Sequence, residues 1–282
     1  MEILDRLLTA VILIAVFYVL FFIGKLIHDL LHREYNLTME LVEKDNPAVA
    51  LAVAGYYLGL VLAIGGALVG PSRGIISDLF DLGIYGLLSI IMLNLSWVLC
   101  DRVILSRFRM SDELIRDRNS GTGAVSFGVS VATGLIIYGS VAGEGGSIWT
   151  AMAFWAMGQV MLTIAAVVYR AVVPYDLHAE IEKDNVAAGV SFAGALIGMG
   201  MVVGLAAQRD FHSWRADLVP YVIIALLGLI LLPVIRFLTD KVLLPTVHLT
   251  DEIASQETPN VGAAYIEAFS YIAASFVIYW CV

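Results

Sequence analysis

A single carboxylate, Glu267, lies inside a long apolar stretch near the end of the chain. It follows Asn260 by seven residues, which places it about 10 Å along a helix that begins there. A carboxylate at this depth is costly in lipid, so we expect it to face a bundle interior or a cavity. Its neutral form could carry a proton, or release one to admit a cation. The alternative is a protonated Glu267 that hydrogen-bonds a neighbouring helix.

Two further polar side chains lie inside other apolar stretches and could partner this carboxylate. Asn94 and Gln159 complete, with Glu267, our candidate intramembrane site for an ion or a proton. Each of them could instead hydrogen-bond across helices as an ordinary packing contact, and the sequence does not choose between these roles.

Four polar linkers each carry a glutamate, followed by an asparagine that opens the next apolar stretch. An Asn side chain can cap a helix, and Pro47 after Asn46 suits a first helical turn. Capping explains the four asparagines without a ligand, whereas the alternative is a cytoplasmic mouth that attracts cations. The residues of this candidate mouth are Glu40, Asp45, Asn46, Glu113, Asn119, Glu180, Asp184, Asn185, Glu252 and Asn260.

His28 and His32 lie one helical turn apart, a spacing that zinc proteases use in His-Glu-x-x-His. Asp29 is shorter than the glutamate of that motif, and no third ligand is identifiable. We therefore expect the first helix to continue through this pair, with two solvated histidines that titrate, and a metal site is the alternative. The sequence contains no glycine-rich phosphate loop, serine nucleophile elbow or redox cysteine pair, so we expect neither an enzyme nor a cofactor.

The composition of the chain is that of a membrane protein. Its 282 residues are 60% hydrophobic and 15% charged, whereas soluble domains carry about 25% charged residues. A transmembrane helix needs about 20 mainly apolar residues. Stretches that qualify lie near residues 7–24, 47–70, 82–100, 122–142, 148–173, 186–207, 218–238 and 260–281. The expected fold is all-α, a polytopic protein with eight transmembrane helices in contact with the lipid bilayer.

The distribution of basic residues predicts the orientation. Twelve of the 16 Lys and Arg residues are assigned to the linkers after the first, third, fifth and seventh apolar stretches, including Arg170 and Arg236, which stand at the ends of their stretches. The positive-inside rule therefore places these four long linkers in the cytoplasm and both termini outside. The same linkers hold 17 of the 25 carboxylates, which argues against binding to anionic headgroups, and the net charge of −9 argues against nucleic acid.

The chain is an internal duplication. Residues 43–46, Glu-Lys-Asp-Asn, recur at 182–185, and residues 101–105 correspond to 240–244 at the same offset of 139. Two units follow, 1–143 and 144–282, and four spans in each unit give both units the same orientation. Within each unit the order of apolar stretch, Glu-bearing linker and Asn occurs twice. We therefore expect four tandem helical hairpins in two parallel repeats.

The pattern Asp-Asn-x-Ala followed by Ala-Gly in the next span resembles the YjfL-like family of bacterial inner-membrane proteins, a domain of unknown function numbered 350. Residues 45–48 and 184–187 carry the resemblance, whereas Arg118 and Pro259 replace the aspartate in the second hairpin of each unit. The resemblance covers the whole chain as two fused copies. It implies a multi-pass protein of the bacterial inner membrane and brings no established chemistry.

Two functions are consistent with these residues. The first is a channel or transporter-like protein for a small cation or proton, motivated by Glu267, the acidic linkers and the repeat symmetry. The second is a structural or partner-binding membrane subunit of an envelope-stress assembly, motivated by long charged linkers on one face. A homo-oligomer or a membrane partner fits either function.

Overall fold

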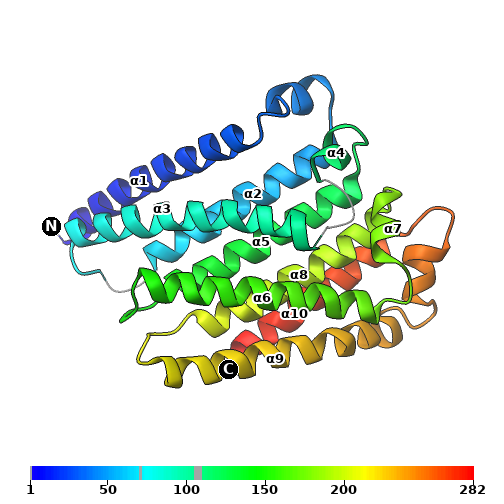
Figure 1. Cartoon of the computed structure of the whole chain (residues 1–282). Coiled ribbons are helices and arrows are strands. Elements are labelled where there is room, and N and C mark those ends of the chain that lie inside the picture. The colour runs from blue at the N-terminus through cyan, green and yellow to red at the C-terminus, as the bar shows by residue number, and fades with distance from the viewer. Residues whose placement is uncertain (1, 70–71, 105–109) are drawn as a thin grey trace.

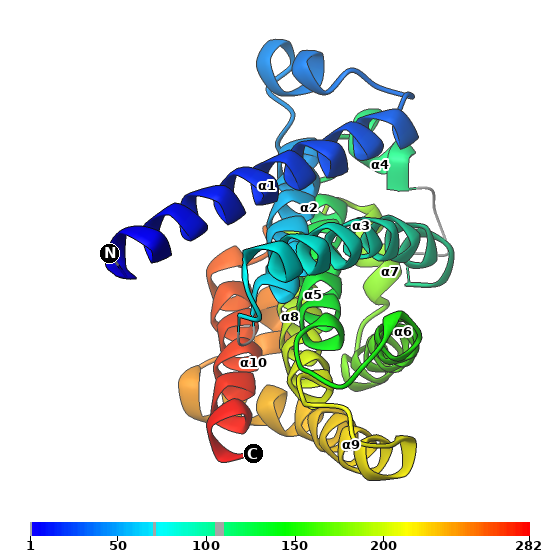
Figure 2. The same ribbon diagram turned by 90° about the vertical axis from the view of Figure 1, so that its left-hand side faces the viewer.

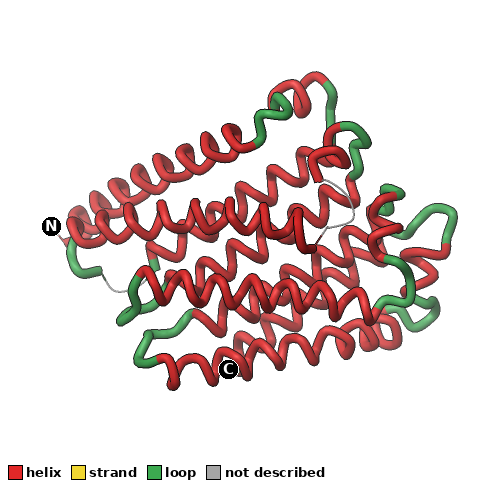
Figure 3. The backbone as a smooth tube through the Cα atoms, viewed as in Figure 1, coloured by secondary structure: helices red, strands yellow, loops and turns green. Residues whose placement is uncertain are grey.

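The computed structural model describes residues 2–69, 72–104 and 110–282, and this part of the chain forms helices and no strands (Figure 3). Eight of its helices are long and apolar enough to cross a membrane. They are α1 (Glu2–Leu31), α2 (Pro47–Gly65), α3 (Ile75–Leu99), α5 (Ser120–Val141), α6 (Ile148–Val172), α8 (Val186–Ala207), α9 (Trp214–Leu238) and α10 (Val261–Cys281). The chain is an all-α polytopic membrane protein, as its composition predicts.

Short helices occupy the connections. The α-helices α4 (Met110–Ile115) and α7 (Leu177–Glu182) lie in the linkers, and η2 (Gly66–Leu68) extends α2 as a 3₁₀ turn. The π-helical turns are η1 (Met39–Glu43), η3 (Cys100–Ile104), η4 (Thr239–Leu243) and η5 (Asp251–Ser255). The four long linkers gather at one end of the bundle, at the right of Figure 1, and the short connections lie at the opposite end with the N terminus. We call these the linker end and the distal end.

Helices α1 and α3 extend furthest beyond the stretches that the sequence predicts. Helix α3 begins at Ile75 and not near residue 82, because the charge of Asp78 is accommodated at its first turn. The Asp78 carboxylate accepts hydrogen bonds from the Ser72 hydroxyl at 2.5 Å and the Arg73 amide at 3.1 Å. Helix α1 continues to Leu31, so the expected continuation is confirmed through His28, whereas His32 lies just beyond the last residue of the helix.

The membrane helices form two layers (Figures 1 and 2). The second helix of each hairpin lies in a row in the order α2, α5, α8, α10, and we call these the inner helices. The first helix of each hairpin, α1, α3, α6 or α9, is an outer helix. Helix α3 packs against α2 and α5, α6 against α5 and α8, and α9 against α8 and α10. Each of these three outer helices therefore covers the seam between two inner helices.

Glycines bring the inner helices into backbone contact. A Cβ atom on Gly139 would lie 1.9 Å from the carbonyl oxygen of Gly204, and a Cβ on Gly134 would lie 2.5 Å from that of Gly59. Such contacts are the usual way for helices to pack in lipid, where no hydrophobic force drives them together. The glycine pattern of the inner helices thus sets the close spacing of the row.

Candidate functional site

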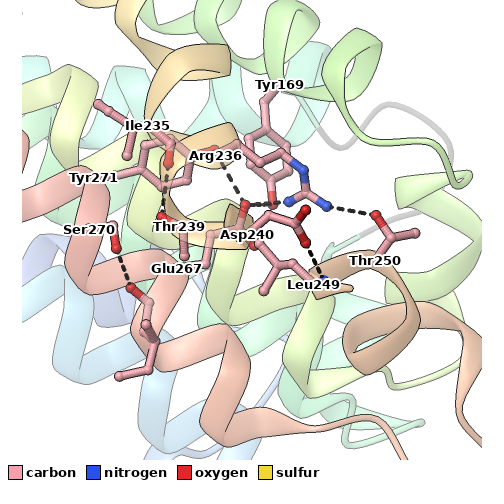
Figure 4. A network of polar contacts seen from close by, with 11 residues as sticks. Tyr169, Ile235, Arg236, Thr239, Asp240, Leu249, Thr250, Glu267, Ser270 and Tyr271 are labelled. Carbon is pink, nitrogen blue, oxygen red and sulfur yellow. Dashed lines mark hydrogen bonds and ion pairs between the residues drawn. The ribbon is translucent and has the colours of Figure 1, made fainter. Parts of the chain in front are cut away.

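Glu267 is fully buried where three helices meet near the linker end (Figure 4). Its Oε1 atom accepts a hydrogen bond from the guanidinium of Arg236, which also forms an ion pair with it. The hydroxyls of Tyr271 and Tyr169 donate to the same oxygen at 3.3 and 3.5 Å. The second oxygen, Oε2, accepts no hydrogen bond from the described residues. The carboxylate therefore lies in an ion-paired cluster that joins α6, α9 and α10.

Arg236 corrects the sequence analysis, which assigned this residue to a linker. It lies in the last turn of α9 with 6% of its surface exposed. Its Nη2 atom donates to the Thr250 hydroxyl at 3.4 Å, so the guanidinium also ties α9 to the following linker (Figure 4). Arginine retains its charge in proteins, and an ion pair lowers the cost of a carboxylate in the membrane. A basic residue inside the predicted stretch 218–238 was the available signal for this partner.

The structure does not bring Asn94 or Gln159 to Glu267. The Asn94 amide donates to the Tyr56 hydroxyl at 3.1 Å and to the Ile90 carbonyl at 2.8 Å. The Nε2 atom of Gln159 is buried and has no partner among the described residues. These two polar groups occupy separate positions in α3 and α6, and the three residues form no common site.

The four linker asparagines cap the four inner helices, as the sequence predicts. The Oδ1 atom of each accepts from a backbone N–H in the first turn of α2, α5, α8 or α10. The side-chain amide donates to the glutamate of the same linker at 3.1, 2.9, 3.0 and 2.7 Å. We call these the Glu–Asn pairs: Glu40–Asn46, Glu113–Asn119, Glu180–Asn185 and Glu252–Asn260.

Three of the asparagines make a second bond that connects one hairpin to the next. Asn46 donates to the Leu114 carbonyl at 2.9 Å, Asn119 to the Ile181 carbonyl at 2.7 Å and Asn185 to the Ile253 carbonyl at 2.8 Å. Each acceptor directly follows the glutamate of the next linker. The candidate mouth residues therefore form a row of linked pairs along the linker end.

The two aspartates of the candidate mouth differ in their contacts. Asp184 accepts from the backbone amides of Ser120 at 2.7 Å and Gly121 at 3.3 Å, and so caps the preceding inner helix α5. Asp45 occupies the corresponding place in the first linker. Both aspartates have a positive φ, which is 48° at Asp45 and 60° at Asp184. Asp45 is exposed, and no inner helix precedes α2 in the chain.

Charge at the linker end is shaped by local contacts. The Lys44 ammonium, which donates to Glu40 at 2.6 Å, lowers the pKa of that carboxyl below its ordinary value. Burial raises the pKa of Glu113 instead, and the hydrogen bond from Asn119 opposes this shift only in part. Two equivalent positions of the repeat therefore respond to acid in opposite directions.

His28 and His32 are buried, which corrects the expectation of solvated histidines. The rings stack at a centroid distance of 4.1 Å, with Tyr56 at 4.2 Å from His28 and Trp97 at 4.2 Å from His32. Burial lowers the pKa of His32, which lies just beyond α1. Among the described residues no group of three or more His, Cys, Asp or Glu could hold a metal ion. Aromatic side chains from α2 and α3 cover the pair, which the sequence could not indicate.

Two of the hollows in the described chain lie away from Glu267. One of about 580 Å³ lies at the distal end, where Arg73, Glu144 and Arg209 contribute to its lining. The other, of about 10 Å³, lies between α8, α9 and α10, with Tyr271 and Ser275 in its wall. Glu267 lines neither hollow, and the smaller one is at the lower limit for a single water molecule.

Comparisons with known proteins agree with this architecture. The model of the Domain of Unknown Function (DUF350) matches residues 2–141 and again residues 145–282. The chain is also similar to the UPF0719 transmembrane protein of Aquifex aeolicus (strain VF5), with 24% identity over 270 residues, 94% of this chain and 96% of that relative. No solved structure matches the chain. The chain therefore belongs to the DUF350 family and carries two copies of its domain.

Proposed function

We propose that this protein is a structural, partner-binding subunit of a membrane assembly. In this proposal it lies in the bacterial inner membrane, with the four linkers in the cytoplasm and both termini outside. The observation that carries the proposal is the row of linked Glu–Asn pairs, in which three amides join each linker to the next. These bonds hold four linkers as one surface beside the membrane.

The surroundings of Glu267 support this function over ion transport. Arg236 neutralises the carboxylate, two tyrosine hydroxyls contact the same oxygen, and the side chain is fully buried. A carboxylate that carries protons or cations must exchange with water during each cycle. A buried ion pair joined to three helices is suited instead to fixing α6, α9 and α10 together.

The linker surface offers a partner an acidic face. Its carboxylates that point to solvent are not consumed by the Glu–Asn pairs, and they leave room for a partner with a basic surface. Such residues are Glu34, Glu43, Asp45, Asp112, Glu182, Asp251 and Glu257. The proposal includes no catalytic step.

The first test separates a structural role from transport. The wild-type protein and Glu267→Gln are reconstituted into vesicles, and proton and potassium fluxes are measured against protein-free vesicles. We expect the fluxes of all three preparations to be equal. A flux in wild-type vesicles that Glu267→Gln abolishes would overturn the structural proposal in favour of transport.

The second test examines partner binding in cells. A photo-reactive amino acid replaces Asp117 or Glu182 on the linker surface, and Glu144 or Asp210 at the distal end serves as a matched exposed control. We expect one stoichiometric adduct of defined mass from the linker positions and none from the distal positions. The absence of any adduct from both linker positions would contradict the proposal.

A further inference from the structure

The contact between neighbouring inner helices occurs three times in one register. In each case the ninth residue after a capping Asn is a glycine that meets the eighth residue after the next capping Asn. A Cβ atom on these glycines would lie 2.3, 2.6 and 2.3 Å from the Cα atom opposite. The pairs are Gly55 with Phe127, Gly128 with Ala193 and Gly194 with Ala268. The same contact therefore joins each inner helix to the next one in the row, both within a unit and between the two units.

At each end of the row of inner helices one half of this repeated contact is missing, and the two missing halves are complementary. The Asn260 amide donates to Glu252 but, unlike the other three, to no carbonyl of a following linker in the described chain. The Leu41 carbonyl directly follows Glu40, yet no side chain of the described residues donates to it. Asn260 is exposed, whereas its three equivalents are at most 4% exposed. The Asn260 amide at one end of the row is thus a donor without its second acceptor, and the Leu41 carbonyl at the other end is an acceptor without a side-chain donor among the described residues.

The helix faces at these ends are also open. On α2 the stripe equivalent to the one that α5 turns toward the preceding inner helix carries the exposed residues Ala50, Ala54 and Val61, and Tyr57, which is half-buried against Phe21 of α1. Helix α1 packs against one inner helix, α2, whereas α3, α6 and α9 each pack against two. A further inner helix, placed before α2 in the row, would therefore fit in the seam between α1 and α2, and the described chain has no helix there.

We propose that a second copy of this chain places its α10 in the seam between α1 and α2, so that the row continues from one molecule into the next. This docking rests on the proposed structural role and names its partner. The Asn260 amide of one copy donates to the Leu41 carbonyl of the other. The Asp45 carboxylate reaches the first backbone amides of the neighbouring α10, as Asp184 reaches those of Ser120 and Gly121. The second copy thereby completes the fourth Glu–Asn pair.

One residue at the end of the row departs from the internal rule. Phe269 occupies the ninth position after Asn260, where the other inner helices have glycine, and it is 64% exposed. Its ring would face Ala54 of the second copy, whose small side chain leaves space for it. Gly262, with open space around it apart from the Asn260 side chain, lies where the copies approach most closely. The copies therefore meet tightly at the linker end and diverge toward the distal end.

The interface has the character expected for association in lipid. Small residues and hydrogen bonds, not hydrophobic burial, drive helices together in a bilayer. The contact joins two different surfaces, α10 of one copy and α1 with α2 of the other, so it is heterologous and can repeat from copy to copy. Both surfaces remain free at the ends of any open assembly.

Cysteine cross-linking tests the register of this contact. In a Cys100→Ser, Cys281→Ser background, Ala54→Cys and Phe269→Cys are combined in one chain and oxidised in the membrane. We expect reducible multimers from the double variant and none from either single cysteine. Ala54→Cys with Val160→Cys, an exposed position on α6, is the matched control. Multimers from the control pair at the same yield, or none from the test pair, would overturn the proposed register.

Native mass measurement of the purified protein tests the assembly without added cysteines. The wild type is expected at twice 30.6 kDa or a higher multiple. Asn260→Ser retains a capping oxygen but loses the amide, and we expect it to weaken association about threefold to tenfold. Asn119→Ser, the same change at an internal position, should lower the unfolding midpoint and leave association unchanged. A monomeric wild type at every concentration would refute self-docking.

The outcomes separate this inference from the proposed function. A monomeric protein that still cross-links to a different protein in cells refutes self-docking and supports partner binding. Multimers together with a Glu267-dependent flux refute the structural role and support the docking geometry.

Discussion

The glutamates of the Glu–Asn pairs and Glu267 are all carboxylates held by hydrogen bonds, but different partners stabilise them. At the linker end an asparagine amide satisfies each carboxylate, and at Glu40 the ammonium of Lys44 adds a charge. About two helical turns farther into the membrane, Glu267 has an arginine and two tyrosines around one oxygen. The linker arrangement is repeated four times, whereas the arrangement around Glu267 occurs once.

The depth of a carboxylate in the bundle governs the kind of partner that it needs. At the linker end each carboxylate accepts from a neutral amide, with an ammonium added at Glu40 and Glu180, although Glu40 and Glu113 are themselves buried. Deep in the bundle, an unpaired carboxylate would cost several kcal/mol, so a full positive charge is required. The residues seven positions after the caps of α2, α5 and α8 are Val53, Ser126 and Phe192, which need no such partner. Among these four equivalent positions, only the one in α10 holds a carboxylate, and Arg236 accompanies it.

The largest effect is expected from Arg236→Met. It leaves the fully buried Glu267 without a counter-charge, and we expect the free energy of unfolding in mixed micelles to fall by about 3–5 kcal/mol. The double variant Arg236→Met, Glu267→Met removes both charges and should recover most of this loss. A single variant as stable as the wild type, or a double variant no better than the single, would show that depth does not impose the pairing.

Asn119→Ser should have the next largest effect. It removes the bonds to Glu113 and to the Ile181 carbonyl, and we expect a loss of about 2 kcal/mol in the same unfolding measurement. Asn260→Ser removes one exposed bond and should reduce the free energy of unfolding by a small fraction of that amount. Equal losses of unfolding free energy at both positions would mean that the bond from Asn119 to the Ile181 carbonyl contributes no stability.

Tyr271→Phe tests the shell around the ion pair. The variant keeps the ring but removes a hydroxyl that donates to Glu267 at 3.3 Å, so we expect a loss of about 1 kcal/mol. Tyr56→Phe is the control, because its hydroxyl donates to the Gly24 carbonyl at 3.0 Å and accepts from the Asn94 amide at 3.1 Å, without a charged partner. The comparison fails if Tyr56→Phe, measured in the same unfolding experiment, costs more than Tyr271→Phe.

The smallest effect concerns the acid response of two equivalent linker glutamates. The pKa of Glu40 is lowered from 4.5, so its contribution to stability is present above that value and is lost as the pH falls through the folded pKa. The pKa of Glu113 is raised from 4.5, so its contribution is present below that value and is lost as the pH rises through the folded pKa.

Unfolding midpoints of Glu40→Gln and Glu113→Gln, measured against the wild type across about pH 3.5–6, check this contrast. The wild-type advantage over Glu40→Gln should shrink as the pH falls, because acid removes the charge that Lys44 stabilises. Glu113→Gln should gain on the wild type as the pH rises. Parallel pH curves for the two variants would contradict the opposite shifts.

Much of the fold is readable in the sequence because it depends on local composition. Apolar length predicts the eight membrane helices, and Asn before an apolar stretch predicts the four caps. Arg236 illustrates where this reading fails. Its position at the end of a predicted span is equally compatible with a solvated side chain, and only the rotation of α9 against α10 turns it toward Glu267.

Composition and repetition along the chain establish the class of protein, the duplication and the residues that recur in each linker. The groups that those residues contact depend on how the helices and linkers pack together. The second bonds of Asn46, Asn119 and Asn185 end on backbone carbonyls, which every residue possesses and no sequence pattern marks. The seams of the row likewise depend on which glycine face meets which helix, and that is set by packing between segments distant in the chain.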